Sequence, residues 1–256
     1  MSLQDKINYI VTSLKEIEPE DGFIVSFSSG RDSCVIKDIF TRNNIKATYY
    51  YCETSLENNT ILEYIATYHP EVIKLPPIKT IYELIKEHRK VPTIDDRFCC
   101  HENLYQLTRN ISRINNTIVT GSRNNILFKK HKYYFTQKTL GVLTINPIFD
   151  WTTEEVKEYC DYYNLPLLPT YELYGRSYNC VCCPRMYASS KKLMQEYHPE
   201  VFNKLKKVVF EVWEENLDLH TEYKTPEDYW DYYINCDVEV ECNKVRLREN
   251  QLTYKR

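Results

Sequence analysis

Short runs of β-branched and aromatic residues alternate with amphipathic helical patterns along most of the chain. The predicted strands cover residues 22–27, 47–51, 72–75 and 117–120. Because helices separate these strands, consecutive strands are expected to run parallel, with helices covering both faces of the sheet. The alternation therefore predicts a Rossmann-like α/β fold with a mostly parallel sheet, whose ligands bind at the carboxyl ends of its strands.

The pattern changes along the chain and predicts two parts. Ser2 is the expected N-cap of a first helix, and residues 131–145 are expected to form a hairpin-like stretch. After residue 185 the pattern becomes helical and then irregular. We therefore expect one domain over residues 1–185 and a helical or irregular C-terminal extension over residues 186–256.

Bulk composition is typical of a globular chain without a membrane segment. Hydrophobic residues make up 43%, charged residues 27%, and the net charge is −3, so no global charge favours nucleic acid or a membrane. No apolar run approaches the roughly 18 residues that a spanning helix needs. The N-terminus runs into a helical pattern without signal-peptide features. We expect a cytoplasmic protein.

Ten cysteines are many for a reducing compartment, and five of them gather in the two segments 99–100 and 180–183. Such clusters indicate metal binding or catalysis before disulfides. Four thiolates, two of them at C-x-x-C spacing, complete a set that suits an iron–sulfur cluster or a zinc ion. Buried free cysteines are the plainer interpretation, and the clustering argues against it.

Residues 26–33 read SFSSGRDS and lie between a predicted buried strand and a helix. Small residues let backbone N–H groups converge at the positive end of the helix dipole, which predicts an anion cradle. The segment is not a Walker A loop, and a serine-capped turn without a ligand is the plainer alternative. Asp32 is expected either to hold a magnesium ion or to cap the helix. The predicted phosphate-binding residues are Ser26, Ser28, Ser29, Gly30, Arg31, Asp32 and Ser33.

This loop resembles the S-[FG]-S-G-G-x-D-S pyrophosphate loop of the adenine nucleotide alpha-hydrolase superfamily, with Ser29 in place of a glycine. Members of that superfamily act or bind at the alpha-phosphate of ATP or a related adenylate. Residues 51–57, YCETSLE, are similar to its D-T-G-x-E stretch, with Glu53 replacing Asp and Ser55 replacing Gly. The resemblance implies that the loop holds phosphates and that the region of Glu53 serves the adenosine.

Further segments resemble the phosphoadenosine/adenosine phosphosulfate reductase family. Residues 97–100 (RFCC) look like its R-[WF]-C-C, and residues 174–184 (YGRSYNCVCCP) resemble its G-x-x-R-x-G-C-x-x-C-P. Residues 147–156 (PIFDWTTEEV) are similar to its P-[IL]-x-x-W-[TS]-x-x-[ED]-[VI] segment, and residues 120–123 (TGSR) resemble its G-x-R turn. These segments occur along the chain in the same order as in the family. In adenosine phosphosulfate reductases this cysteine arrangement carries a [4Fe–4S] cluster. Carried over by position, the implied ligands are Cys99, Cys100, Cys180 and Cys183.

Basic residues beside these motifs are the expected partners of a phosphosulfate or a triphosphate, since guanidinium groups bind such anions in a bidentate way. Solvated surface charge is the alternative for each of them. They are Arg31, Arg97, Arg123, Lys129, Lys130 and Arg176. Arg97 and Arg176 are favoured because each lies within four residues of a cluster cysteine. Gly121 and Glu53 complete the predicted substrate-binding set.

The C-terminal segment departs from the family, whose reductases carry their nucleophilic cysteine in an E-C-G-[LI]-H motif. This chain has ECNKV at residues 241–245, so the Gly and the His are missing. The catalytic residue is therefore left open. Cys242 and the spare thiol Cys182 are the candidates.

Two reactions follow from the resemblance. The first is reduction of adenosine phosphosulfate, or of its 3′-phosphate, by thiol attack on the sulfur, with a thioredoxin-like electron donor. The alternative is ATP-dependent adenylation and sulfur transfer to a nucleic acid or a metabolite, and only this reaction needs a nucleic-acid partner. A non-catalytic, zinc-stabilised nucleotide-binding module is the third interpretation. The sequence is compatible with a homo-oligomer and does not identify the acceptor.

Overall fold

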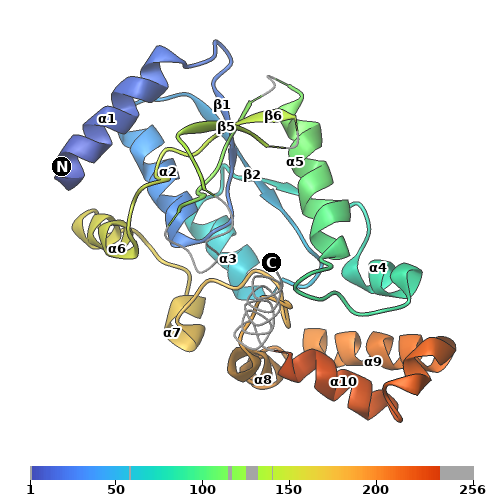
Figure 1. Cartoon of the computed structure of the whole chain (residues 1–256). Helices are drawn as coiled ribbons and strands as arrows, with labels where there is room; N and C mark the ends of the chain where they lie inside the picture. Colours follow the sequence, from blue (N-terminus) through green and yellow to red (C-terminus); the bar gives the residue numbers. More distant parts are fainter. Residues whose placement is uncertain (1, 58, 115–116, 125–131, 140, 237–256) are drawn as a thin grey trace, which may run out of the picture. The chain divides into compact units, whose positions relative to one another are not determined.

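The computed structural model describes residues 2–57, 59–114, 117–124, 132–139 and 141–236 (Figure 1). By its internal contacts the chain divides into two compact units. The first comprises Met1–Glu53, Asn59–Pro76 and Leu104–Ser177, and the second comprises Thr54–Asn58, Pro77–Asn103 and Tyr178–Arg256. Each unit is assembled from segments that are far apart in the sequence. The predicted domain boundary after residue 185 stays a prediction.

The first unit contains the sheet. Its strands are β1 Phe23–Ser26, β2 Ala47–Cys52, β3 Ile73–Leu75, β4 Thr117–Val119, β5 Thr136–Thr139 and β6 Val142–Ile145. Within the described residues they form one six-stranded sheet in the order β3-β2-β1-β4-β6-β5. The pairs β1–β2, β1–β4, β2–β3 and β4–β6 are parallel, and β5 pairs antiparallel with β6. This last pair confirms the predicted hairpin.

Helices cover both faces of this sheet. In the first unit they are α1 Leu3–Glu16, α2 Arg31–Arg42, α3 Asn59–Tyr68, α5 Tyr105–Ser112, α6 Thr153–Tyr162 and α7 Thr170–Tyr174. Phe23 and Val25 of β1 join a large core with residues of α1, α2, α3 and α6, whereas Ile24 packs with Ile111 of α5 and Ile118 of β4. Figure 1 shows α1, α2 and α6 on one side of the strands and α5 on the other. The predicted α/β fold is confirmed.

The strand order places a topological switch point at β1. From β1 the chain proceeds outward to β2 and β3, and it returns later to add β4 on the opposite side of β1. Because Val25 pairs with Val119 in a parallel ladder, residues 27–30 and 120–123 leave the sheet at the same edge. In open α/β sheets ligands bind in the crevice at such a point.

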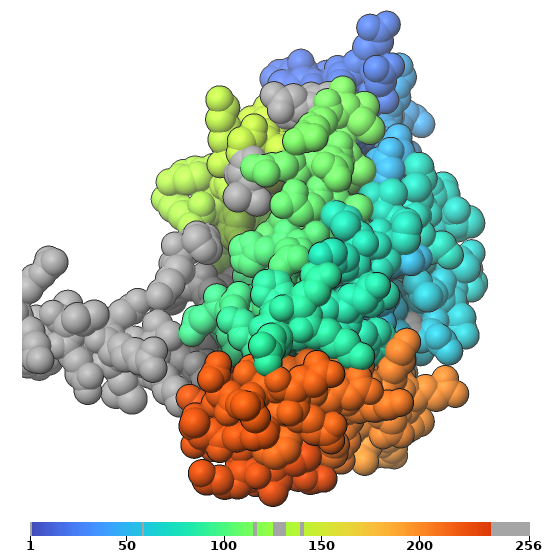
Figure 2. Space-filling view, turned by 90° about the vertical axis from the view of Figure 1, so that its right-hand side faces the viewer, coloured from blue at the N-terminus to red at the C-terminus, as the bar shows by residue number. Residues whose placement is uncertain are grey.

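The second unit is helical in its described residues. Its elements are α4 Ile81–His88, the π-helical turn η1 Cys100–Leu104, α8 Ala188–Tyr197, α9 Pro199–Glu215, the 3-10 helix η2 Leu217–Thr221 and α10 Pro226–Asn235. The amphipathic α9 is central, since α4, α8 and α10 all pack against it. Figure 2 shows the orange and red surface of α9 and α10, with the teal segment that includes α4 directly against it.

Two local expectations can be compared with the structure. Ser2 caps α1 as predicted, with its Oγ accepting a hydrogen bond from Asp5 N at 3.2 Å. The helix expected near residue 101 begins instead with η1, a wider turn that is common near functional sites. No helix in the described part of the chain is both long and apolar enough to span a bilayer.

Candidate functional site

The loop after β1 carries the predicted anion cradle. Gly30 is the N-cap of α2, and its carbonyl oxygen accepts hydrogen bonds from Cys34 N at 3.0 Å and from Ser33 Oγ at 2.8 Å. Ser28 Oγ donates to Ser33 Oγ at 3.3 Å. The hydroxyl groups therefore fold the loop onto the first turn of α2. The N–H groups of this turn and the positive end of the helix dipole favour an anion.

Ser29 occupies the position at which the loop takes a left-handed backbone conformation. Its φ is 60°, its side chain is buried, and its Oγ donates to Ser28 O at 2.5 Å. This conformation costs a residue with a β-carbon about 1 kcal/mol relative to glycine, which explains why the similar superfamily motif has glycine there. Gly30 has a φ of −75°, which any residue adopts.

Gly30 is needed for space rather than for conformation. A β-carbon on Gly30 would lie 2.9 Å from Ser177 Oγ and 3.6 Å from the Tyr171 hydroxyl. Tyr171 OH accepts a hydrogen bond from Arg31 N at 2.9 Å and donates to Ser177 Oγ at 3.2 Å. α7 and the segment after it therefore pack directly on the loop, a contact that no sequence motif indicated.

Gly121 lets the loop after β4 approach the first turn of α2. A β-carbon there would lie 3.0 Å from Asp32 Cβ and 3.5 Å from Ser33 N. The buried Arg123 pairs with Asp32, with Nε and Oδ1 3.0 Å apart, and its Nη1 donates to Trp151 O at 3.1 Å. Burial raises the pKa of the Asp32 carboxyl, and the charge of Arg123 opposes that rise. Asp32 is thus an ion-pair partner and not a helix cap.

Arg31 brings a guanidinium group to the cradle. The group stacks on Tyr171, with its central carbon 3.9 Å from the ring centroid. Within the described residues, the buried Arg31 Nε has no hydrogen-bond partner. A buried donor is costly unless it is paired, so Arg31 fits a phosphate or sulfate oxygen as its partner.

The structure brings most of the predicted substrate residues to one edge of the sheet. They are Ser26, Ser28, Ser29, Gly30, Arg31, Asp32, Ser33, Gly121 and Arg123. Glu53 leaves the same sheet after β2, and Arg176 is exposed beside Ser177. Arg97 belongs to the second unit. Lys129 and Lys130 lie outside the described residues.

The four predicted cluster cysteines lie together in the second unit, and every pair of their thiols interacts electrostatically. A hydrogen bond from Cys99 lowers the pKa of Cys100 to about 6, and the charge of Arg97 adds to this effect. The same bond raises the pKa of Cys99. Burial raises the pKa of both Cys180 and Cys183.

The stretch after β2 anchors the C-x-x-C loop within the second unit. The side chain of Thr54 is hydrogen-bonded to the Cys180 thiol, and Val181 N donates to Leu56 O at 2.8 Å. The segment that resembles D-T-G-x-E therefore also supports a cysteine loop. Sequence reasoning assigned this segment to the adenosine alone.

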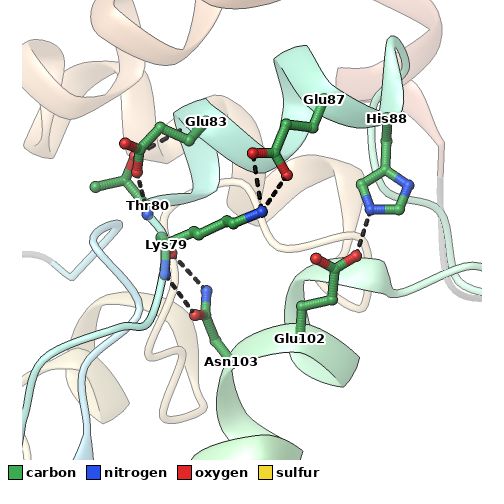
Figure 3. A network of polar contacts seen from close by, with 7 residues as sticks. All are labelled: Lys79, Thr80, Glu83, Glu87, His88, Glu102 and Asn103. Atoms are coloured by element: carbon green, nitrogen blue, oxygen red, sulfur yellow. Dashed lines mark hydrogen bonds and ion pairs between the residues drawn. The ribbon is translucent and has the colours of Figure 1, made fainter.

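A polar network joins α4 and the residues just before it to Glu102 and Asn103, which follow the paired cysteines in the sequence (Figure 3). Asn103 Oδ1 accepts from Lys79 N at 3.1 Å, and Asn103 Nδ2 donates to Lys79 O at 2.7 Å. His88 at the end of α4 contacts Glu102, and its ring stacks on Phe98 with centroids 4.1 Å apart. Since Phe98 and Glu102 flank the two cysteines in sequence, α4 fixes their position.

The C-terminal helices contribute residues that sequence reasoning missed. Tyr233 OH of α10 donates to Cys182 O at 2.7 Å, and Lys191 of α8 is completely buried. The sequence signal for Lys191 was weak: it lies three residues before Met194, on the buried face of α8.

Burial raises the pKa of the Cys182 thiol to about 12, which disfavours this thiol as a nucleophile. The other candidate, Cys242, lies outside the described residues.

The four thiols fit an iron–sulfur cluster in donor chemistry, because soft thiolates in one neighbourhood are its usual ligands. Their mutual electrostatic interaction supports this grouping. Among the residues that the structure describes, no three His, Cys, Asp or Glu side chains stand close enough together to hold a metal ion. The described residues therefore offer suitable donor types without a preformed ligand shell.

A mostly parallel sheet with a Ser/Gly loop at its switch point defines the class, an α/β protein of the nucleotide-binding type. The chain belongs to the phosphoadenosine phosphosulfate reductase family, because the model of the phosphoadenosine phosphosulfate reductase domain matches residues 22–186. This confirms the family resemblance of the motifs. No curated protein matches the chain.

The solved structures that are similar to the chain include the following three. Phosphoadenylyl-sulfate reductase from Candida auris, a phosphate complex, is 17% identical over 68% of this chain and 92% of that one, with a TM-score of 0.46. NH3-dependent NAD synthetase from Campylobacter jejuni, in complex with nitrate, is 18% identical over 81% of this chain and 93% of that one, with a TM-score of 0.49. NMN synthetase from Francisella tularensis is 19% identical over 64% of this chain and 70% of that one, with a TM-score of 0.46. Family membership rests on the match to residues 22–186.

The contact of Gly30 with Ser177 gives a test of the loop. Gly30→Ala should weaken binding of adenosine phosphosulfate about tenfold, or about 1.4 kcal/mol, because the new methyl group pushes the loop away from Ser177. The double variant Gly30→Ala/Ser177→Ala should recover most of the affinity, since the clashing hydroxyl is gone. Titration calorimetry measures both, with Ser177→Ala as the control. Wild-type affinity in Gly30→Ala would place the phosphates elsewhere.

Proposed function

We propose that this chain is an enzyme that binds adenosine phosphosulfate, or its 3′-phosphate, and reduces the sulfur of that substrate. One observation carries the proposal: the Ser/Gly loop stands at the switch point of the sheet in a chain of this family. The first turn of α2 supplies N–H donors and a positive dipole end for the phosphate.

The side chains around the loop support the proposal that it binds a phosphosulfate. Ser28 and Ser33 bring hydroxyl groups to the loop, and Arg31 brings a buried guanidinium nitrogen that an anionic oxygen can satisfy. Asp32 is paired with Arg123, so we assign both to holding the loop in shape. A magnesium ion would bind Asp32 only in exchange for that ion pair.

The proposed reduction uses the electrons of two thiols. One thiolate attacks the sulfur of the substrate, which forms a bond between the two sulfur atoms and releases the adenosine phosphate. A second thiolate then attacks the thiol sulfur of this adduct, which releases sulfite and leaves a disulfide. A thioredoxin-like donor supplies thiols that restore the reduced state.

The proposed cluster ligands are Cys99, Cys100, Cys180 and Cys183. Such a cluster supplies, when bound, a redox-active and negatively charged centre. Zinc at the same four thiols is the alternative, and it would make this site purely structural.

The tail favours a second reaction. Residues 241–245 read ECNKV, without the Gly and His of the reductase motif. In this alternative the loop holds ATP, an adenylated intermediate forms with release of pyrophosphate, and a sulfur atom is transferred to a nucleic acid or a metabolite.

The metal proposal predicts different results for two neighbouring cysteines. Anaerobically purified wild-type protein should be brown, with about four irons and four sulfides per chain. Cys183→Ser should lose the iron because it removes a ligand, whereas Cys182→Ser should retain it. Iron and sulfide analysis and the visible absorption spectrum provide the measurement. A colourless wild type with one zinc per chain would contradict the cluster assignment.

The reaction proposal predicts which product appears. With adenosine phosphosulfate or its 3′-phosphate and a dithiol reductant, the iron-loaded protein should release one sulfite per adenosine phosphate. ATP without an acceptor should yield no pyrophosphate, because the proposed reaction cleaves no phosphoanhydride. Sulfite and pyrophosphate assays on one preparation decide between the reactions. Pyrophosphate from ATP together with no sulfite from either phosphosulfate would establish the alternative.

A further inference from the structure

Tyr171 contacts both the backbone and the side chain of Arg31. It lies on α7, and its hydroxyl accepts a hydrogen bond from Arg31 N at 2.9 Å. The central carbon of the Arg31 guanidinium group lies 3.9 Å from the centroid of the Tyr171 ring. One aromatic residue therefore restrains the start of α2 and the cationic side chain at that start.

The ring orders the guanidinium group before a ligand arrives. A free arginine side chain has many rotamers, and the cost of ordering it on binding lowers the affinity. A guanidinium group that is stacked on an aromatic face is already ordered, so part of this cost is removed. The N–H groups lie in the plane of the guanidinium group, and a ring that covers its face does not occupy them.

One nitrogen of the stacked group lacks a partner. Arg31 Nε is buried and has no hydrogen-bond acceptor among the residues that the structure describes. A buried unpaired donor is unfavourable, and the Tyr171 hydroxyl does not satisfy it, because this hydroxyl is bonded to Arg31 N and to Ser177 Oγ. Tyr171 therefore holds the group in an arrangement that an anionic oxygen at the loop would stabilise.

The Tyr171 hydroxyl also decides which part of Arg31 can meet an anion. The first N–H groups of a helix have no acceptor within the helix. Arg31 N is one of these groups in α2, and it is bonded to Tyr171. Burial raises the pKa of the Tyr171 phenol, so the hydroxyl stays neutral and adds no negative charge beside the loop. Arg31 therefore offers an anion its side chain and not its backbone.

A purely structural role for Tyr171 is the alternative. The residue packs against the large core of the first unit, and its hydrogen bonds could serve only to dock α7 on α2. Docking of this kind does not require the ring to lie over the guanidinium group, since the hydroxyl alone joins the two helices. It also does not account for a buried Arg31 Nε without an acceptor.

We propose that Tyr171 is a positioning residue for anion binding, whose ring holds the Arg31 guanidinium group ready for a phosphate or sulfate oxygen of the substrate. The proposal rests on the proposed function, because it takes a phosphosulfate as the ligand of the loop. Tyr171 acts through Arg31, so its effect on affinity is expected only while Arg31 is present.

A double-mutant cycle tests this dependence. Titration calorimetry on full-length, anaerobically purified protein measures the affinity for adenosine phosphosulfate, or for its 3′-phosphate if that binds more tightly. Arg31→Met should weaken binding about thirtyfold, because it removes a charge-assisted hydrogen bond. Tyr171→Leu should weaken binding about fivefold, because the guanidinium group must then be ordered on binding. In the Arg31→Met background, Tyr171→Leu should change the affinity by less than about twofold.

Further variants separate the ring from the hydroxyl and from general effects on the protein. Tyr171→Phe keeps the ring, and its affinity should be within about twofold of the wild-type value. Tyr163→Leu is the matched control, since the Arg42 guanidinium carbon at the other end of α2 lies 4.2 Å from the Tyr163 ring centroid. This control should leave the affinity unchanged. If Tyr171→Leu does not fold, Tyr171→Met is measured instead with the same expectation.

Several results would overturn the proposal. The same loss from Tyr171→Leu with and without Arg31 would show an effect that is independent of the guanidinium group. Equal losses in both single variants and the double variant would show that the pair only supports the loop. A loss in Tyr171→Phe as large as in Tyr171→Leu would assign the effect to the hydroxyl. Wild-type affinity in Arg31→Met, or loss of folding in both Tyr171→Leu and Tyr171→Met, would leave Tyr171 a structural residue.

The failures of the two proposals are distinguishable. Wild-type protein that binds neither adenosine phosphosulfate nor its 3′-phosphate overturns the proposed function, and this proposal with it. Wild-type protein that binds one of them, together with any of the contrary results for the variants, overturns the role of Tyr171 and leaves the proposed function standing.

Discussion

The candidate nucleotide site depends on the close approach between Gly121 and the first turn of α2. A β-carbon on Gly121 would lie 3.0 Å from Asp32 Cβ, so glycine lets the loop after β4 reach this point without displacing α2. The approach places Arg123 where it pairs with Asp32. Asp32 is paired with Arg123, while the guanidinium group of Arg31 stacks on Tyr171. The shape of the cradle therefore depends on two features, the parallel pairing of β1 with β4 and the small size of Gly121.

The cysteine site depends on different contacts, all within the second unit. Thr54 and Leu56 support the C-x-x-C loop from one segment, α4 supports the paired cysteines from another, and α8 and α10 add a third. Residues after 186 resembled an extension in the sequence. In the structure, Tyr233 of α10 donates a hydrogen bond to Cys182 O in the cysteine loop, and the buried Lys191 of α8 is bonded to the Tyr233 carbonyl oxygen.

The sequence predicted the sheet and the loop because both leave local patterns. Strand runs and helical periodicity alternate, and the loop is a run of small polar residues between a strand and a helix. Ser29 and Ser55 replace motif glycines, and both have left-handed φ values of 60° and 66°. The contacts of Tyr171 with Arg31 and of Lys191 with α10 were not predictable, because they join segments that no local pattern relates. The positions of the cysteines in the sequence also could not show that α4, α8 and α10 support the cysteine loops.

The central claim is that the first turn of α2 holds the phosphate of an adenylyl sulfate. A crystal structure of the protein with adenosine phosphosulfate, determined anaerobically, tests it most directly. The account predicts the phosphate at the N–H groups of Gly30, Asp32 and Ser33, with the Arg31 guanidinium bonded to a phosphate or sulfate oxygen. An ordered nucleotide bound away from these residues, with the loop unchanged, would contradict the account.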